Sequence, residues 1–523
     1  MYAQIKTVAF LGVEAKLITV QVQVASGLPA FNIVGLPDKA VAESRERVRA
    51  ALNALGLGLP PKRITVNLSP ADLPKIGSHY DLPIALGLMA ATGAITCDKL
   101  QTYLAIGELA LDASISPVVG ALPAAISANR QGLGLICPQA CGSEAAWASD
   151  EMEILAPSHL LELVNHLKGS QLLSAPKPQI SSLAKPQDNQ ADIADIKGQE
   201  GAKRALEVAA AGGHNLIMVG PPGAGKSMLA ARLPSILPPL SSEEMLEVSM
   251  VQSLAGELMS GSLSQARPFR APHHSATMAA LVGGGSKPRP GEVALAHHGV
   301  LFLDELPEFS GQVLDSLRQP LETGEISIAR ANHRITYPSK IQLIGAMNPC
   351  RCGKAFEPGF ACAKGANCAQ RYQARISGPL LDRIDIQIEV PAVTALDLLD
   401  ESPIEASKDI RERVIAARTI QAQRYKDLLG DPFVLNATCP PTVLNDITAP
   451  TGEGKKLLKE AALKLNLSAR GFHKALRVAR TLADLEGSPT VERAHLAESL
   501  SYRSQTTRIE ATADHNIAQP VPR

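Results

Sequence analysis

The spacing of apolar residues over positions 1–168 alternates between the repeat of a strand and that of a helix. Residues 18–24 (ITVQVQV) alternate apolar and polar side chains, which predicts a half-buried strand. Asp38 precedes a run with apolar residues at helical spacing and can cap the helix that this run predicts. A further strand is predicted at 64–68 (ITVNL) and a buried helix at 82–91 (LPIALGLMAA). An α/β domain is therefore expected over this region.

The pattern changes at residues 169–192, which hold three prolines among Ser, Gln and Asn and show no apolar period. This composition predicts a linker, and an irregular surface excursion of one domain is the alternative. Residues 193–395 return to an α/β pattern. From 396 to 510 the chain is helix-rich, as in 470–485 (RGFHKALRVARTLADL), where apolar residues share one helix face. The end, 511–523, is expected to be a flexible tail.

Composition narrows the function classes. A chain of 523 residues exceeds one hydrophobic core, so two to four domains are expected. Lys plus Arg and Asp plus Glu both number 51, so any nucleic-acid binding must use a local ring or groove. Aromatic residues make up only 3%, which argues against a surface built on base stacking. The amino terminus lacks a signal-peptide pattern and no apolar run is long enough to span a membrane, so we expect a cytoplasmic protein without membrane contact.

The strongest motif is a P-loop at 215–233 (NLIMVGPPGAGKSMLAARL), where an apolar strand leads through a glycine-rich turn into a helix. Its glycines let backbone amides face phosphates, and the start of the helix adds positive potential there. Lys226 is expected to reach the β- and γ-phosphates of ATP, and Ser227 to ligate Mg²⁺. The predicted nucleotide-binding residues are Gly220, Pro221, Pro222, Gly223, Ala224, Gly225, Lys226, Ser227 and Asp304.

Three further segments carry candidate catalytic residues. The segment 299–309 (GVLFLDELPEF) delivers Asp304, expected to hold Mg²⁺ with Ser227, and Glu305, expected to orient and deprotonate the attacking water. A strand at 340–349 ends in Asn348, which can position that water. Arg383 lies in GPLLDRIDI between acidic and apolar neighbours, and on local sequence alone a salt-bridged structural arginine is the favoured interpretation.

The order of these motifs resembles an AAA+ ATPase of the branch shared by magnesium chelatases and minichromosome maintenance helicases. Within that branch the chain closely resembles the ComM family, also called YifB or magnesium-chelatase-like proteins. The stretches that carry this resemblance are GLPDKAVAESRERVRAAL (35–52), RAPHHSATMAALVGGG (270–285), GEVALAHHGVLFLDELPEF (291–309) and SGPLLDRIDI (377–386).

The resemblance implies an α/β fold with an AAA+ P-loop ATPase core at 193–395 and a C-terminal helical lid at 396–510. It assigns Asn348 as sensor 1 and Arg383 as an arginine finger that reaches a neighbouring subunit, which requires a homo-hexamer. Arg470 becomes the sensor 2 arginine of the lid, although Lys474 and Arg477 share its helix face and compete for that role.

Residues 1–168 resemble the Lon protease domain, an α/β fold of the ribosomal S5 domain 2 type. Lon-type proteolysis needs a serine nucleophile and a lysine base. The corresponding positions fall at about His79 and Pro123, and neither residue can do this chemistry. The resemblance therefore implies a noncatalytic domain for substrate or partner contact.

Four of the eight cysteines lie within 348–368. Cys350, Cys352, Cys362 and Cys368 are spaced C-x-C-x9-C-x5-C, and four thiolates can hold Zn²⁺ tetrahedrally, although the first spacing is tighter than the usual C-x2-C. Buried free thiols, disulfides and an iron–sulfur cluster are the alternatives. We expect a structural zinc site that stabilises a long glycine-containing loop and shapes the ring interface.

Two segments carry candidate DNA-binding residues. Positive charge gathers in 266–299 around a GGG run, and 325–338 (EISIARANHRITYP) predicts a hairpin with a basic tip. In related helicases, insertions at these places are pore loops that grip nucleic-acid backbone. The predicted contacts are Arg267, Arg270, Lys287, Arg330, His333 and Arg334. The pairs His273–His274 and His297–His298 are metal-ligand candidates, for which hydrogen-bonded loop histidines are the favoured alternative.

Two function classes follow. The first, favoured by the basic loops and by the resemblance, is an ATP-driven DNA motor with helicase or branch-migration activity that integrates incoming DNA during natural transformation and recombination, with recombination proteins as further partners. The second is a chelatase-like or chaperone-like remodeller of a protein partner. A protease is excluded because the serine and the lysine are missing. ATP, Mg²⁺ and Zn²⁺ are the expected cofactors.

Overall fold

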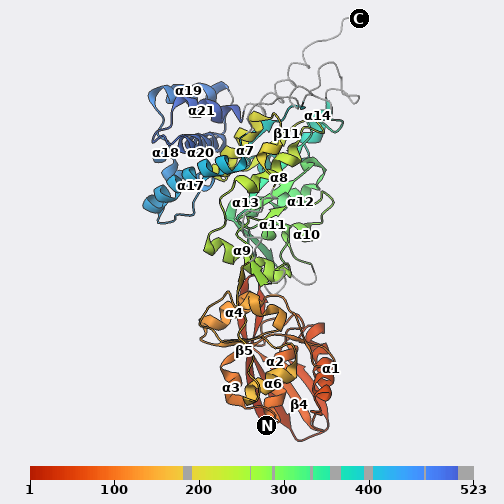
Figure 1. Ribbon diagram of the computed structural model, residues 1–523. Helices are drawn as coiled ribbons and strands as arrows, with labels where there is room; N and C mark the ends of the chain where they lie inside the picture. Colours follow the sequence, from red (N-terminus) through yellow and green to blue (C-terminus); the bar gives the residue numbers. More distant parts are fainter. Residues whose placement is uncertain are drawn as a thin grey trace, which may run out of the picture.

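The computed structural model describes residues 1–180, 191–258, 261–285, 289–329, 334–353, 367–393, 405–464 and 467–503. Figure 1 shows the amino-terminal residues as one lobe and the P-loop region as a second lobe stacked on it, with the helices after residue 405 beside the second. Among the described residues, no helix is both long and apolar enough to cross a membrane.

The amino-terminal lobe is built on a seven-stranded mixed sheet. Its order is β3 (Ala30–Val34), β4 (Arg63–Ser69), β2 (Glu14–Ala25), β1 (Tyr2–Leu11), β5 (Tyr103–Ala105), β8 (Gly134–Ile136) and β9 (Ile154–Leu155). β1, β2 and β4 pair antiparallel, whereas β1, β5, β8 and β9 pair parallel. The alternation over 18–24 places every second side chain of β2 in the core, which confirms the predicted strand.

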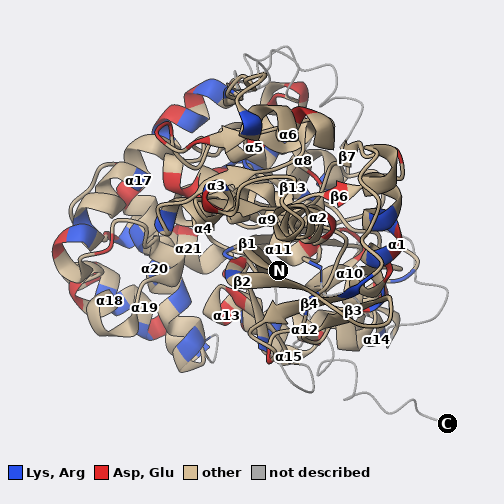
Figure 2. Cartoon of the chain, turned by 90° about the horizontal axis from the view of Figure 1, so that it is seen from below, with Lys and Arg blue, Asp and Glu red and all other residues tan. Residues whose placement is uncertain are grey.

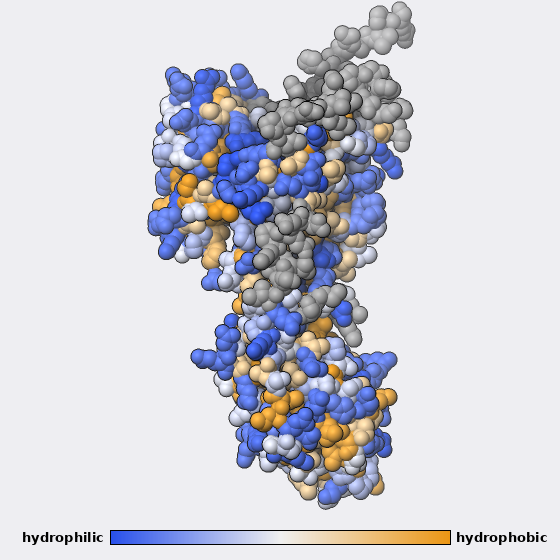
Figure 3. Space-filling view, viewed as in Figure 1, coloured by the Kyte–Doolittle hydropathy of each residue, from blue (hydrophilic) through white to orange (hydrophobic). Residues whose placement is uncertain are grey.

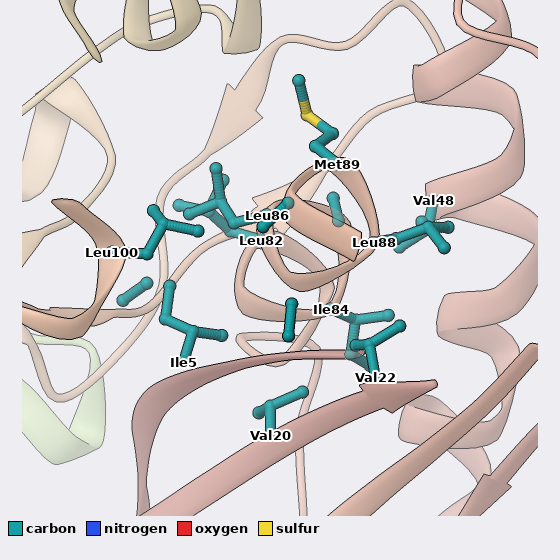
Figure 4. Close-up of a cluster of buried hydrophobic side chains, with 14 of the residues drawn as sticks. Ile5, Val20, Val22, Val48, Leu82, Ile84, Leu86, Leu88, Met89 and Leu100 are labelled. Atoms are coloured by element: carbon teal, nitrogen blue, oxygen red, sulfur yellow. The ribbon is translucent and has the colours of Figure 1, made fainter. Parts of the chain in front are cut away.

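Two predicted helices pack into the hydrophobic core beside this sheet. The side chain of Asp38 accepts a hydrogen bond from the backbone N–H of Val41 and caps α1 (Lys39–Ala54), as predicted. Helix α2 (Asp81–Ala91) is buried over its whole length, as its continuous apolar run predicted. Figure 4 shows α2 above the strands that carry Ile5, Val20 and Val22, with Val48 and Leu100 on either side of the helix. The remaining elements of this lobe are α3 (Cys97–Gln101), β6 (Glu108–Leu109), β7 (Ile115–Ser116), α4 (Ala121–Arg130), α5 (Gly142–Ala145) and α6 (Leu160–Lys168).

The second lobe holds a five-stranded sheet in which every pair is parallel. Its order is β13 (Phe269–Arg270), β14 (Val300–Leu303), β17 (Gln342–Met347), β11 (Leu216–Val219) and β18 (Ile386–Glu389). Parallel strands bring their carboxyl ends to one edge, where ligands bind in open α/β sheets. The strands before the P-loop, before Asp304 and before Asn348 are adjacent, so their functional ends converge. The helices and remaining strands are α7 (Glu200–Gly212), α8 (Lys226–Ile236), α9 (Ser242–Ala255), α10 (Met278–Val282), α11 (Glu292–Leu295), α12 (Gly311–Ser316), α13 (Arg318–Thr323), β15 (Glu325–Ala329), β16 (Arg334–Pro338), α14 (Asn367–Gln373) and α15 (Gly378–Leu381).

After residue 405 the α-helices of the described chain are α17 (Ser407–Leu429), α18 (Pro441–Ile447), α19 (Gly452–Lys464), α20 (Ala469–Leu485) and α21 (Arg493–Ser501). The apolar face predicted at 470–485 is the buried face of α20. Helices α17 and α20 pack against α7, and α17 also packs against α8, which carries the P-loop lysine. Part of the predicted linker is structured, because β10 (Gln179–Ile180) pairs with β12 (Ser262–Leu263); residues 181–190 lie outside the described chain.

The two lobes meet at the turn between β1 and β2 and at α4. Gly12 in that turn lies against the strand β16, so close that a Cβ atom on Gly12 would fall 2.2 Å from the carbonyl oxygen of Thr336. Val13 packs beside Ile335 and Tyr337 of the same strand. The buried carboxylate of Glu144 accepts hydrogen bonds from the backbone of Leu122 and from the hydroxyl of Ser253 on α9, which joins the lobes through a polar contact. A cavity of about 330 Å³ lies at this junction.

Candidate nucleotide site

The P-loop connects β11 to α8 in the predicted strand–loop–helix order. Gly225 immediately precedes α8 and has φ +85°, a left-handed conformation that glycine adopts without steric cost. Gly220 must also be glycine, since a Cβ atom there would lie 2.2 Å from the carbonyl oxygen of Val390. The loop therefore turns tightly enough to bring successive backbone amides toward the start of the helix, which is the geometry that binds phosphate.

Lys226 lies inside this loop with little of its side chain exposed. Its ammonium donates hydrogen bonds to the carbonyl oxygens of Gly220 at 2.8 Å and Pro221 at 2.9 Å, and to Oδ1 of Asn348 at 3.2 Å. Burial lowers the pKa of Lys226, and the carboxylates of Asp304 and Glu305 oppose that shift. The P-loop lysine and the predicted sensor asparagine are thus in direct contact.

The residues predicted for magnesium also meet. The hydroxyl of Ser227 donates to Oδ2 of Asp304 at 2.7 Å, and the other oxygen of Asp304 accepts from the backbone N–H of Glu305 at 2.9 Å. A hydroxyl and a carboxylate at hydrogen-bond distance beside a phosphate cradle are the oxygen ligands that Mg²⁺ takes together with substrate phosphates. The donor set therefore fits Mg²⁺ bound with a nucleoside triphosphate.

A cavity of about 340 Å³ opens at this point. This is within the usual range of small-molecule sites. Of the predicted residues it is lined by Pro222, Gly223, Ala224, Gly225, Lys226, Ser227, Asp304, Glu305 and Asn348. Met228 and Met347 also line it and were not predicted. Gly220 and Pro221 take part through their carbonyl contacts with Lys226 rather than through the cavity wall.

Glu305 has a neighbour that the sequence did not indicate. Nδ1 of His274 lies 3.4 Å from Oε2 of Glu305, and the ring of His273 lies 4.0 Å from that of His274. Glu305 itself has φ +50°, an uncommon backbone conformation for a side-chain-bearing residue, as found at many functional sites. The only sequence signal was the paired histidines after β13, which suggested a basic loop or metal ligands. The structure instead brings His274 to the acidic strand end.

The predicted arginine finger, Arg383, and the three candidates for sensor 2 lie outside the cavity and differ in their partners. Arg383 donates to Oε2 of Glu322 at 2.7 Å and to the carbonyl oxygen of Pro379 at 2.6 Å. In this structure Arg383 therefore forms a salt bridge within its own chain. Lys474 is buried and donates to the backbone carbonyl oxygens of Asp382 and Ile384.

The side chain of Arg470 is 67% accessible, and its guanidinium lies 3.8 Å from a carboxylate oxygen of Asp382. Asp382 directly precedes Arg383 in the chain. Arg477 donates to the carbonyl oxygen of Cys439, so its guanidinium has an internal partner. Neither Arg383 nor Arg470 lines the nucleotide cavity. Their assignment as arginine finger and sensor 2 stays a prediction.

His297 and His298 form a hydrogen-bonded network with Glu247. Their Nε2 atoms lie 3.0 and 2.7 Å from the same Glu247 oxygen. The backbone N–H of Lys340 donates to Nδ1 of His297, which therefore carries its proton on Nε2 and donates it to Glu247. A metal on that Nε2 would force a proton onto Nδ1 against the Lys340 N–H. The geometry favours loop histidines with hydrogen-bond partners over metal ligands.

The candidate DNA contacts divide into three groups. Arg267 is nearly buried and pairs with Glu244, and Arg270 pairs with Glu257 and Glu292, so the prediction that they contact DNA draws no support from their positions. Arg334 is exposed at the end of β16 nearest the turn of the hairpin. Lys287, Arg330 and His333 lie outside the described residues. Antiparallel pairing of β15 with β16 confirms the predicted hairpin. Figure 2 shows basic and acidic residues interspersed along the chain, as expected for a protein without net charge.

The described cysteines of the 348–368 segment converge. Cys350, Cys352 and Cys368 place their sulfur atoms within 4.8 Å of one another, and Cys362 lies outside the described residues. Of the two positions that the predicted Lon resemblance singled out, His79 is buried with Nε2 2.9 Å from the carbonyl oxygen of Val8, and burial lowers its pKa to about 4. Pro123 is buried in α4.

Three family models match the chain. They are described as magnesium chelatase, subunit ChlI, over residues 192–398; subunit ChlI of Mg-chelatase, over 20–141; and magnesium chelatase, subunit ChlI C-terminal, over 404–503. Relatives include YifB of Salmonella typhimurium and the competence protein ComM of Haemophilus influenzae. Each is 43% identical and aligns over 96% of this chain and 97% of the relative. A magnesium-chelatase 38 kDa subunit of Rhodobacter capsulatus is 26% identical over 62% of this chain and 91% of its own length. With a nucleotide site of this geometry, the chain belongs to the ComM/YifB family of magnesium-chelatase-like AAA+ proteins, a membership that implies ATPase activity.

Proposed function

We propose that this protein is an ATP-driven hexameric DNA motor with helicase or branch-migration activity, which promotes integration of incoming DNA during natural transformation and recombination. The single observation that carries the proposal is full-length similarity to a protein named for competence, joined to an assembled nucleotide site. Competence is the ability of a cell to take up DNA. An ATPase that acts in this process is expected to act on DNA or on a protein bound to DNA.

In the hydrolysis step the described residues have separate tasks. Bound Mg²⁺ would neutralise charge on the β- and γ-phosphates. Lys226 places its ammonium against the same oxygens once ATP displaces its carbonyl contacts. The amide of Asn348 orients the attacking water, and the carboxylate of Glu305 accepts its proton. The γ-phosphate then leaves with the water oxygen, and ADP keeps the bridging oxygen.

A ring is part of the proposal because no arginine among the described residues lines the nucleotide cavity. The finger candidate Arg383 and the exposed Arg470 lie around Asp382 and Glu322, so one surface carries both cations. Arg383 must exchange Glu322 for a phosphate of the adjoining subunit. Such an exchange couples hydrolysis to assembly, as in ATPases that receive an arginine in trans.

The hairpin β15–β16 is the proposed DNA-gripping element. Arg334 is exposed beside its turn, and six copies around a ring would create a basic channel in a chain without net charge. Contact with the phosphate backbone through such cations needs no base-specific hydrogen bond, which suits a motor that moves along any sequence.

The amino-terminal lobe is proposed to contact a substrate or a recombination partner. It exposes large apolar side chains near its edge strand β3, with Leu28 87% and Leu36 60% accessible. Figure 3 shows apolar side chains on the surface of this lower lobe.

Zinc remains part of the proposal. The sulfur atoms of Cys350, Cys352 and Cys368 lie close enough for one ion, with Cys362 as the predicted fourth ligand. Three converging thiols of which one is exposed give a soft site with an open side.

The motor is tested with a fluorescently labelled four-way junction. Wild-type protein with ATP should convert the junction to duplex products, while Glu305→Gln should bind it without converting it. Arg334→Ala should weaken junction binding and lower the slope of log affinity against log salt by about one per subunit contact. The exposed Arg493 of α21 offers a matched control, and Arg493→Ala should leave both unchanged. Binding without ATP-dependent conversion would reject the motor.

A second function has one observation in its favour, because all three matching family models carry the name of a magnesium chelatase subunit. A chelatase-like or chaperone-like ATPase would remodel a protein partner instead of DNA. In that case the rate of ATP hydrolysis would be the same with every DNA substrate and would change when the protein partner is added.

A further inference from the structure

The cysteine trio Cys350, Cys352 and Cys368 joins two segments of the second lobe. Cys350 and Cys352 follow the end of β17, and Cys368 lies on α14. The sulfur atoms of Cys350 and Cys352 are 3.1 Å apart, and all three lie within 4.8 Å of one another. Tetrahedral zinc with bonds of about 2.3 Å separates its sulfur ligands by about 3.8 Å. The trio therefore spans the space of one thiophilic ion, with Cys350 and Cys368 buried and Cys352 exposed.

The first arm of the trio, residues 348–353, contacts the P-loop. The turn at Gly353 closes with a hydrogen bond from its N–H to the carbonyl oxygen of Cys350 at 3.0 Å. Gly353 has φ +79°, and a Cβ atom on it would lie 2.6 Å from Cδ of Pro222, a residue that lines the nucleotide cavity. Two residues before Cys350, Asn348 accepts a hydrogen bond from Lys226. This arm thus contacts the nucleotide cavity on both sides of its cysteines.

The second arm, helix α14 with Arg375 just beyond it, contacts the segment that follows Asp304 and Glu305. At the end of α14, Gln373 donates to the carbonyl oxygen of Pro349, which ties the helix to the first arm. Arg375, just beyond the helix, donates to the carbonyl oxygen of Pro307 at 3.2 Å and to Glu308 at 2.8 Å. Those two residues closely follow the strand end that carries Asp304 and Glu305. The helix that bears Cys368 is therefore anchored to the opposite wall of the nucleotide site.

We propose that a thiophilic divalent cation bound by Cys350, Cys352 and Cys368 clamps these two walls together and so sets the nucleotide affinity of its own subunit. The inference rests on the metal site proposed above and adds its regulatory role within one subunit, in contrast to the expected role at the ring interface. The ion adds a second cross-link to the hydrogen bond by which Gln373 ties α14 to Pro349, which removes further conformational freedom from the P-loop wall. Without the ion, we expect ATP to bind about tenfold more weakly, the order of effect of one lost hydrogen bond to a charged group.

The test uses the full-length protein carrying Arg383→Ala, which removes the contribution that the predicted finger would make to a neighbouring site. Zinc content is measured by atomic absorption. The dissociation constant of a fluorescent ATP analogue is then measured before and after treatment with a chelator that prefers zinc to magnesium, and again after Zn²⁺ is restored. Loss of affinity on removal and recovery on return support the clamp. Zinc binding without any change in affinity overturns it, and failure to hold zinc overturns the metal site itself.

Two variants separate the ion from the contact it supports. Cys352→Ser should lose zinc and affinity together, while Cys97→Ser, a half-buried cysteine of the amino-terminal lobe, should lose neither. Gly353→Ala keeps all three cysteines but forces the turn away from Pro222, so it should retain zinc and still bind ATP more weakly. Normal ATP affinity in Gly353→Ala would show that the P-loop contact does not transmit the effect. The nucleotide site itself fails only if zinc-loaded protein binds no ATP.

Discussion

Docking of the two lobes through Gly12 gives a prediction whose size follows from the structure. Gly12 has φ +65°, and alanine in that conformation costs about 1 kcal/mol for the backbone alone. Its new Cβ atom would also lie 2.2 Å from the carbonyl oxygen of Thr336, which forces the turn away from β16. Overpacking of this kind costs about 1–3 kcal/mol. Gly12→Ala is therefore expected to lower the free energy of unfolding by about 2–4 kcal/mol.

Gly132 provides a matched control in the same lobe, since it has the same φ of +65° and a Cβ atom added there would meet no other atom within 4 Å. Gly132→Ala should cost only the backbone contribution of about 1 kcal/mol. Urea unfolding of both variants, followed by circular dichroism, measures the difference. Limited trypsin digestion reports whether the predicted linker, residues 169–192, becomes more accessible to the protease in Gly12→Ala. Equal destabilisation by the two substitutions, with unchanged digestion, would refute lobe docking through this turn.

Three further outcomes are expected. Lys226→Ala should lose ATP binding, whereas Glu305→Gln should bind ATP and lose hydrolysis by about a hundredfold or more; equal binding by both variants in a filter assay would contradict the assigned roles. Arg383→Ala alone should not hydrolyse ATP, but mixing it with Lys226→Ala should restore turnover at shared interfaces; no recovery on mixing, in a coupled-enzyme assay, would argue against a finger in trans. Hydrogen bonds from His297 hold the pKa of Glu247 at about 2, below the ordinary 4.5, so the unfolded chain binds more protons at acid pH and stability falls as the pH drops from 4.5 toward 2. Because Glu247 is partly exposed, the loss of folding free energy is about 1 kcal/mol. The urea midpoint of Glu247→Gln should therefore fall less between pH 4.5 and pH 2 than that of the wild-type protein. An equal fall in both proteins would contradict a stabilising hydrogen bond between Glu247 and His297.

The parts of the fold that could be predicted from the sequence are those set by the spacing of residues within one element or between two adjacent elements. Strand β2, the capped helix α1, the buried helix α2 and the face of α20 each follow from periodicity within one element. The P-loop belongs to the same class, because its glycines, lysine and serine act within one turn. The hairpin β15–β16 was also visible because its two strands are adjacent in the chain.

Contacts between distant segments were not accessible to that reasoning. Arg267 and Arg270 looked like free cations in a loop, but their partners Glu244 and Glu292 lie on other elements. His274 reaches Glu305 only because β13 and β14 are neighbours in the parallel sheet. Periodicity says which face of an element is apolar and says nothing about which polar groups the fold brings opposite it.

The cysteine cluster shows the same division. Its spacing predicted a metal site, and three of the four sulfur atoms converge in the described chain. The contact of Gly353 with Pro222 was not predicted, because it depends on the order of β17 and β11 in the sheet. That neighbourhood moves the expected effect of the site from the ring interface to the nucleotide cavity of its own subunit.

The most direct measurement is the rate of ATP hydrolysis by purified protein without DNA, with single-stranded DNA and with a four-way junction, with Glu305→Gln as the inactive control. A DNA motor should hydrolyse ATP several times faster with DNA, and the stimulation should disappear as salt is raised because phosphate contacts weaken. A rate that is abolished by Glu305→Gln but is the same with and without DNA would contradict the motor and leave an ATPase that acts on a protein partner.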